Sequence, residues 1–212
     1  MPPMASGART YGGRSAAERA AERRGRLVAA AITALGTQGE SATTMTGICQ
    51  GAGLTERYFY ESFKGRDDAL VAALDAVAGE VAAAAVAAIE GHAAAGGSAG
   101  EAVGAALAAV VDLVSSDPAK GRVLVVESAA NAPLRARRHA LVGEFADLVA
   151  RQATALYGDR AWPPARARVH GTVFVAGLSE LVAAWLAGEV DLDRDELVAT
   201  GRDLFEAVLR RS

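Results

Sequence analysis

The segment between Thr44 and Leu70 constrains the fold of this chain more than any other part of it. Thr44 and Thr55 are good helix N-caps, and Gly53 between them suits a sharp turn, in the sequence TMTGICQGAGLTERYFYESFKGRDDAL. The pattern predicts two short helices joined by a tight turn. A third, longer helix is expected to begin shortly before Leu70.

The second of these short helices carries aromatic and basic residues at helical spacing. Phe59 and Phe63 are four residues apart, so they share one face and can anchor the helix. The residues that lie on the other sides or on the flank of this face are Arg57, Tyr58, Tyr60 and Glu61. A short anchored helix that presents arginine and tyrosine is suited to a groove of double-stranded DNA.

The same segment resembles the N-terminal signature of tetracycline-repressor-type (TetR-family) transcriptional regulators. The signature residues recur at Thr44, Ile48, Ala52, Gly53, Tyr60, Phe63 and Leu70. Conservative replacements stand at Met45, Cys49, Leu54, Thr55, Phe59, Arg66 and Asp67. The resemblance is specific over roughly residues 20–75 and only architectural beyond them.

The resemblance implies an all-α fold of about nine helices and a division of the chain into three parts. Residues 1–16 are expected to be a disordered basic arm, and residues 17–70 a three-helix helix-turn-helix DNA-binding domain. Residues 71–212 are expected to be a helical ligand-binding and dimerisation domain. The implied function is that of a ligand-responsive, sequence-specific regulator, released as a repressor from a palindromic operator by an unknown small molecule. An activator of the same fold, or a helical interaction protein without DNA binding, remains open.

Candidate DNA contacts fall into two groups. The resemblance implies phosphate contacts by Thr44, Tyr60, Lys64 and Arg66. The candidates for contacts to base edges are Thr46, Glu56, Arg57 and Tyr58. Thr55, which caps the second helix, is also expected at the DNA surface. Glu56 either accepts from a cytosine or caps its helix and pairs with Arg57. Related regulators often carry small residues at the positions of Arg57 and Tyr58, so no operator can be inferred from them.

Charge is distributed unevenly along the chain. The net charge is −3, but residues 1–66 carry +4 and residues 67–212 carry −7. This asymmetry would orient the basic N-terminal part toward the phosphates of DNA. An ordinary solvated surface could carry the same numbers of basic and acidic residues.

Composition agrees with a helical protein. Of the 212 residues, 51% are hydrophobic and only 5% aromatic, and no strictly alternating run of Val, Ile and Thr predicts a strand. Cys49 is the single cysteine, which excludes an internal disulfide and suits a reducing cytoplasm, and buried packing is favoured over redox sensing. No signal peptide is visible, and the uncharged windows Leu27–Gly39 and Ser41–Thr55 are too short to cross a bilayer. The sequence therefore predicts a soluble cytoplasmic protein without a membrane partner.

Helix boundaries can be placed along the whole chain. A first helix is expected from Ala17 to Leu35, ending at Gly36–Gly39, and a small-residue linker from Gly91 to Gly100. The expected starts of later helices are Ser98 with Glu101, Asp117 with Pro118, Asn131 with Pro133, Trp162–Pro164, and Asp193 with Glu196.

The last two helices predict a homodimer interface. Residues 168–186 are apolar around almost the whole helix, and a helix of this kind must be buried on more than one side. Two such helices from each chain would form a four-helix bundle, although a central helix of a monomer would show the same pattern. The residues expected in the interface are Phe174, Leu178, Leu181, Trp185, Leu204, Phe205 and Val208.

The effector site is the least determined part of the prediction. Polar or aromatic residues between about Glu101 and Leu186 that are candidates to line a pocket are Glu127, Asn131, His170 and Phe174. For Glu127 the alternative to ligand binding is a solvated surface position. For His170 it is a hydrogen-bonded position in the core or an interface.

Catalytic patterns are absent from the sequence. The three histidines are far apart, and no Walker, dinucleotide or G-x-S-x-G motif occurs, so neither an enzyme nor a metal or cofactor is expected.

Overall fold

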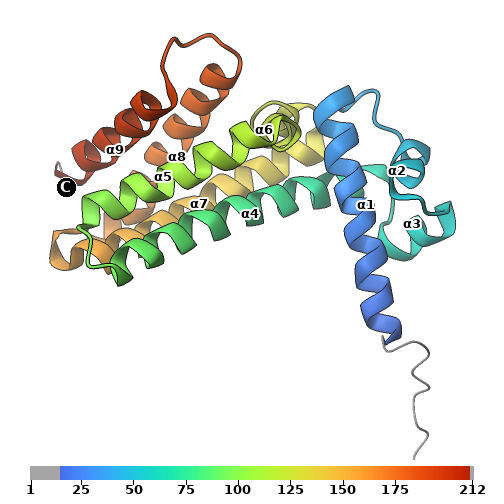
Figure 1. Ribbon diagram of the computed structural model, residues 1–212, viewed down its shortest axis with the longest axis horizontal. Helices are drawn as coiled ribbons and strands as arrows, with labels where there is room; N and C mark the ends of the chain where they lie inside the picture. The colour runs from blue at the N-terminus through green and yellow to red at the C-terminus, as the bar shows by residue number, and fades with distance from the viewer. Residues whose placement is uncertain (1–14, 211–212) are drawn as a thin grey trace, which may run out of the picture.

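The computed structural model describes residues 15–210, and these residues are helical almost throughout (Figure 1). The N-terminal module contains α1 (Ala16–Gln38), α2 (Met45–Ala52), α3 (Glu56–Ser62) and the start of α4 (Arg66–Ala94). The remaining α-helices, which form the body, are α5 (Ala99–Ser116), α6 (Pro118–Val125), α7 (Ala132–Tyr157), α8 (Pro164–Leu186) and α9 (Arg194–Arg210). Two short 3-10 turns, η1 (Glu127–Ala129) and η2 (Gly158–Arg160), flank α7. The described part thus has nine α-helices and no strand, which confirms the all-α prediction.

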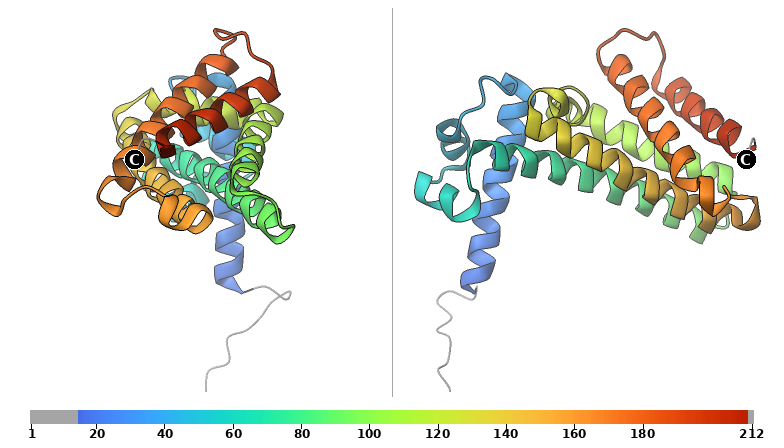
Figure 2. Two further views of the ribbon diagram at one scale, coloured as in Figure 1. Left: turned by 90° about the vertical axis from the view of Figure 1, so that its left-hand side faces the viewer. Right: turned by 180° about the vertical axis from the view of Figure 1, so that it is seen from behind.

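The body is an elongated stack of helices with the N-terminal module at one end. α4, α5 and α7 run along the long axis, α1 crosses one end of them, and α8 and α9 lie over the other end (Figure 1). The view from behind shows α7 beside α4 and α8 crossing over the far part of α7 (Figure 2). α4 therefore belongs to both parts, because its first turns pack in the module and its later turns in the body.

Predicted helix caps are found where the sequence placed them. Ser98 and Glu101 form a capping box at the start of α5, and the Asp117 side chain accepts from the N–H groups of Ala119 and Lys120 at the start of α6. Asn131 accepts from the Leu134 N–H at the start of α7. Each side chain satisfies donors that the first helical turn leaves without an intrahelical partner.

Two predicted boundaries differ from the structure. α1 begins at Ala16, inside the expected arm, because Ser15 and Glu18 form a capping box that the sequence analysis missed. The rest of the expected arm, residues 1–14, lies outside the described residues. The linker expected from Gly91 to Gly100 covers only residues 95–98, because α4 continues through Gly91 to Ala94 and α5 begins at Ala99.

One hydrophobic core joins the module to the body. Leu27, Leu35, Ile48, Phe59 and Leu74 are fully buried in a cluster that also includes residues of α6 and α7. Cys49 is buried in this cluster, as predicted, and burial raises the pKa of its thiol. A thiol kept protonated by its apolar surroundings fits a packing role.

The sequence analysis predicted that no segment is long and apolar enough to cross a membrane, and this prediction was wrong. Among the described residues, α4, α5 and α8 are each long and apolar enough to do so. The sequence analysis counted windows without charges, whereas α4 has an apolar 18-residue window that tolerates a few charged residues. In this fold the apolar faces of α4, α5 and α8 line a pocket and pack against the core of the body.

Candidate nucleic-acid interface and apolar pocket

The turn between α2 and α3 has the geometry that the sequence predicts. Gly53 adopts a left-handed conformation with φ of 61°, which a glycine accepts without strain, and its N–H donates to the carbonyls of Cys49 and Gln50. The Thr44 hydroxyl accepts from the Gly47 N–H at 3.0 Å and caps α2. From α1, the Arg26 guanidinium donates to the Ala52 carbonyl at 2.5 Å and so fixes the C-terminal end of α2.

Two buried phenylalanines hold α3 against the module, as predicted. Phe59 and Phe63 are buried, with ring centroids 5.4 Å apart. The Arg24 guanidinium of α1 lies 4.9 Å from the centroid of the Phe63 ring, which adds a cation–π contact. The orientation of the seven-residue α3 is thus set by tertiary contacts, because a helix of this length is not stable alone.

The outward face of α3 presents Arg57 and Tyr60. The Arg57 side chain is 84% exposed, and its Nε lies 3.2 Å from Glu61 Oε1. Tyr60 is 61% exposed. Glu56 does not pair with Arg57 but accepts from the Thr46 hydroxyl of α2 at 3.4 Å. The predicted pair between Glu56 and Arg57 is therefore not formed.

Tyr58 lies differently from the prediction. Its ring is half-buried under the Arg23 guanidinium of α1, at 4.6 Å from the ring centroid, and Arg23 also pairs with Glu61 at 3.6 Å. The helical-wheel argument placed Tyr58 away from the Phe59 face but could not show that α1 covers that side. Tyr58 is therefore better placed to position α3 than to reach a base edge.

Arg66 also lies differently from the prediction. Its Nε donates to the Thr43 carbonyl at 2.6 Å, and its Nη2 donates to the Glu40 carbonyl and pairs with Glu40 Oε1 at 2.8 Å. A guanidinium with these partners would have to break them to reach a phosphate. Arg66 instead ties the start of α4 to the loop between α1 and α2.

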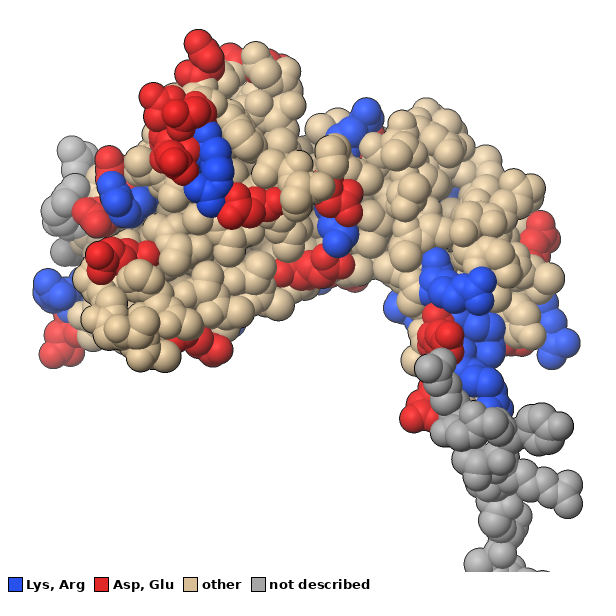
Figure 3. Space-filling view, in the orientation of Figure 1, with Lys and Arg blue, Asp and Glu red and all other residues tan. Residues whose placement is uncertain are grey.

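The remaining candidates for DNA contacts stay accessible. Thr44, Thr46, Thr55 and Lys64 are exposed. In Figure 3 basic side chains gather around the lower part of α1, while many acidic side chains lie over the body. This distribution matches the charge asymmetry of the sequence.

Glu127 and Asn131, which were candidates for a ligand pocket, belong instead to a polar joint between module and body. We call this set of residues, Glu40, Arg66, Arg122, Glu127 and Asn131, the polar joint. Glu127 is buried, its Oε2 accepts from the Glu40 N–H at 2.9 Å, and its Oε1 pairs with Arg122 at 2.7 Å. Asn131 Nδ2 donates to Glu40 Oε1 at 3.0 Å. These bonds connect the α1–α2 loop to the segment between α6 and α7.

The polar joint predicts a pH dependence of stability. Hydrogen bonds from Asn131 and then Arg66 lower the pKa of the Glu40 carboxyl below its ordinary value of 4.5. The unfolded chain then binds a proton at higher pH than the folded one, so this stability is complete above about pH 4.5 and is lost as the pH falls through the lower folded pKa. Urea unfolding from pH 7 to pH 3 should show a weaker acid-side decline in Glu40→Gln than in the unaltered protein.

The control for this measurement is Glu189→Gln, because Glu189 is exposed and its side chain makes no polar contact with the described residues. It should decline with pH as the unaltered protein does. If Glu40→Gln also declines equally, the carboxylate of Glu40 does not stabilise the joint.

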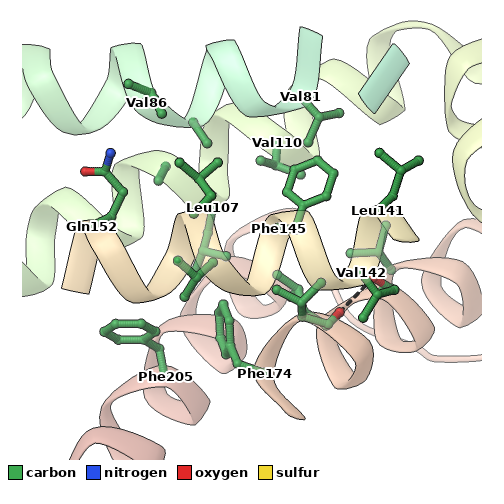
Figure 4. Close-up of a pocket in the computed structure, with 18 of the residues that line it drawn as sticks. Val81, Val86, Leu107, Val110, Leu141, Val142, Phe145, Gln152, Phe174 and Phe205 are labelled. Atoms are coloured by element: carbon green, nitrogen blue, oxygen red, sulfur yellow. Dashed lines mark hydrogen bonds between the residues drawn. The ribbon is translucent and has the colours of Figure 1, made fainter. Parts of the chain in front are cut away.

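The body contains an apolar pocket of about 190 Å³ that is lined by residues of all six helices from α4 to α9 (Figure 4). Val81 and Val86 point into it from α4, Leu107 and Val110 from α5, and Phe145 from α7. Of the four candidates for the effector site, only Phe174 lines this pocket. His170 lies outside the lining with its ring 5.7 Å from that of Trp162.

Several lining residues had no distinguishing signal in the sequence. Most are Val, Leu and Ala at helical spacing, a pattern shared by any packed core. The available signals were Gln152, the one amide side chain within α7, and Arg138, a cation on the same helix.

The predicted dimer residues do not share one outward face. Phe174 and Phe205 are buried inside the protomer with their rings 5.3 Å apart, and the Trp185 indole N–H donates to the Leu192 carbonyl at 2.8 Å. The other predicted residues, Leu178, Leu181, Leu204 and Val208, are half-buried. The periodic pattern was correct about apolar packing, but much of that packing is within the chain. The exposed large apolar residues of α8 are Val169 and Val173, each 59% exposed, and Leu186.

The arrangement of a helix-turn-helix module on an elongated helical body is shared with solved structures. A transcriptional regulator from Syntrophomonas wolfei, described as TetR-family, is similar with a TM-score of 0.72 over 90% of this chain and 96% of that one, at 11% identity. The chain has the fold of the TetR-family regulators. No protein-family model and no curated protein sequence matches it.

Two further structures with this TetR fold are informative. A regulator from Rhodococcus sp. is 24% identical, with a TM-score of 0.65 over 89% of this chain and 99% of that one. The regulator FadR from Bacillus subtilis, solved with stearoyl-CoA, is 17% identical, with a TM-score of 0.67 over 87% of this chain and 96% of that one. All three proteins are described as transcriptional regulators and none as an enzyme.

Proposed function

We propose that this protein is a sequence-specific DNA-binding transcriptional regulator that acts as a homodimer in the cytoplasm and is released from a palindromic operator by a small molecule. The observation that carries the proposal is the outward face of α3. Arg57 and Tyr60 project from a helix that Phe59 and Phe63 hold rigidly, and Thr44 and Lys64 lie exposed beside it. This combination offers base-reading and phosphate-binding groups on one preformed surface.

Selection from a library of random DNA duplexes at two salt concentrations tests the proposal. Enrichment of a palindromic site, with weaker binding at the higher salt, is expected. Salt-sensitive binding without an enriched site would contradict sequence-specific recognition by the protein in its ligand-free state.

Arg57→Ala is expected to weaken binding to the selected operator by about 1–3 kcal/mol, because a bidentate contact to a guanine would be lost. Binding to unrelated duplexes should change far less. Fluorescence anisotropy with both duplexes measures the difference. Arg151→Ala is the matched control, since Arg151 is an exposed arginine of α7 on the body. Equal weakening on all duplexes by Arg57→Ala would assign Arg57 to phosphate.

The proposed homodimer rests on the exposed apolar residues of α8. Val169 and Val173 are four residues apart and form one uncovered strip. Val173→Glu is expected to convert a dimer to a monomer in size-exclusion chromatography with light scattering. Ala87→Glu, which adds the same charge to an exposed position of α4, should leave the mass unchanged. A dimer that survives Val173→Glu would place the interface elsewhere.

The proposed release mechanism uses α4 as the shared element. Arg66 at its start belongs to the polar joint, and Leu74, Val81 and Val86 farther along line the pocket. A ligand that changes the packing of α4 would change the position of the module, provided it binds one arrangement more tightly than the other. The stearoyl-CoA complex of Bacillus subtilis FadR supports a small-molecule site in this fold.

A further inference from the structure

The pocket is lined almost entirely by hydrocarbon. Of its lining residues, only Arg138, Gln152 and Ser179 have polar side chains, and none is acidic. The Ser179 hydroxyl donates to the Val175 carbonyl of its own helix at 2.7 Å. An occupant therefore gains chiefly from burial of apolar surface.

The shape of the pocket favours a chain over a bulky ring system. Its lining on α4 runs from Leu74 to Ile89, which at the rise of a helix is roughly 22 Å, while its volume is about 190 Å³. Leu74 and Leu141, at the end near the module, are buried. Val86 and Ile89, at the opposite end, are half-buried. The lining on α4 is therefore more accessible at the far end of this helix than at the end near the module.

Among residues 15–210, the one cation in the lining of the pocket, Arg138, is already paired with a carboxylate. Arg138 pairs with Glu180 at the module end of the α7 lining, at the opposite end from Gln152. A carboxylate placed among the other lining residues would lose hydration without gaining a partner, which is costly.

Gln152 is the polar side chain available to a ligand. It is half-buried, extends from α7 toward α4 near Val86, and has no hydrogen-bond partner among residues 15–210 (Figure 4). Its amide can donate to, and accept from, a hydroxyl or carbonyl group. This group lies at the accessible end, so a chain that enters with its apolar end first leaves its polar end beside Gln152.

We propose that the pocket binds an uncharged molecule with a straight hydrocarbon chain and a terminal hydroxyl or carbonyl group that hydrogen-bonds to Gln152. The proposal deepens, and rests on, the ligand-responsive function proposed above. The hydrocarbon chain of the ligand would lie in the apolar pocket between α4 and α7. Its polar end would lie at the accessible end of the pocket, beside Gln152.

Isothermal titration calorimetry of the full chain with hexan-1-ol, octan-1-ol and decan-1-ol tests the apolar part. Affinity is expected to rise about fourfold for each added methylene, because each is buried against the lining. Decanoate at pH 7.4 should bind at least about tenfold more weakly than decan-1-ol, because its charge has no partner. Affinity independent of chain length, or decanoate binding as tightly as the alcohol, would overturn the proposal.

Gln152→Leu tests the polar part. It should weaken decan-1-ol binding about fivefold, the usual contribution of one hydrogen bond, and keep the dependence on chain length. Gln38→Leu is the matched control, because Gln38 is exposed on α1 and does not line the pocket. Equal affinities in both variants would refute the role of Gln152, and the chain-length series on the unaltered protein tests the rest independently of either variant.

Binding and release are measured separately, so the two proposals can fail separately. Decan-1-ol that binds the protein but leaves its operator complex intact supports the ligand class and contradicts release. If the protein binds its operator but none of the alcohols, the proposed regulatory function is supported and the proposed class of ligand is contradicted.

Discussion

Phe59→Ala is expected to lower the free energy of unfolding by about 3–5 kcal/mol, the range for removing a buried phenylalanine ring. The Phe59 side chain is fully buried, and its ring packs against those of Tyr60 and Phe63. Because α3 is too short to persist alone, loss of this anchor should also remove specific DNA binding. Urea unfolding followed by circular dichroism measures the first effect, and anisotropy with the selected operator the second.

Tyr60→Ala is the neighbouring control with the opposite profile. Tyr60 is mostly exposed, so the free energy of unfolding should change by no more than about 0.5 kcal/mol. Its loss should weaken binding to all duplexes, as expected for a phosphate contact. If Tyr60→Ala destabilises the protein as much as Phe59→Ala, then α3 is not held by one buried face as described.

The helical elements and their starts could be predicted because their causes are local. The Ser98–Glu101 capping box, the Asp117 cap and the Asn131 cap each act within three residues of the chain. The Phe59–Phe63 face was predictable for the same reason, since i and i+4 neighbours meet within one helix. These features require no knowledge of what the helix packs against.

The roles of polar residues were harder to predict because their partners are distant in the sequence. Glu127 bonds to the backbone of Glu40, 87 residues away, and Arg66 folds back on the same loop. A basic residue near a helix-turn-helix is typical of a phosphate contact, and only the packing of α1 against α4 shows that Arg66 is already engaged. Tyr58 was assigned to DNA for the same reason, because nothing local reveals that Arg23 covers it.

The apolar residues of α8 and α9 show a further limit of periodicity. A helix apolar on several sides must be buried on several sides, but the pattern does not say whether its own chain or a partner does this. Phe174 and Phe205 pack with each other and line the pocket, whereas Val169 and Val173 remain uncovered. Distinguishing the two sets requires the positions of α5 and α7.

Gly36→Ala is expected to destabilise the protein by about 1–3 kcal/mol, although alanine is the better helix former. Gly36 is buried in α1, and a Cβ there would lie 2.4 Å from the Ala119 carbonyl oxygen and 2.5 Å from its Cα. The obstacle is the backbone of α6, which cannot rotate away as a side chain would. α1 and α6 must therefore separate, and with them the module and the body.

The matched control is Gly79→Ala, which should stabilise the protein by about 0.5–1 kcal/mol. Gly79 is an exposed residue within α4, and a Cβ there would meet no atom within 4 Å. Urea unfolding of both variants should thus give changes of opposite sign for the same substitution. Operator affinity should fall in Gly36→Ala alone, because that substitution moves the module relative to the body. If both variants are stabilised, α1 and α6 can separate without cost, and a ligand in the body would then have no rigid contact through which to move the module.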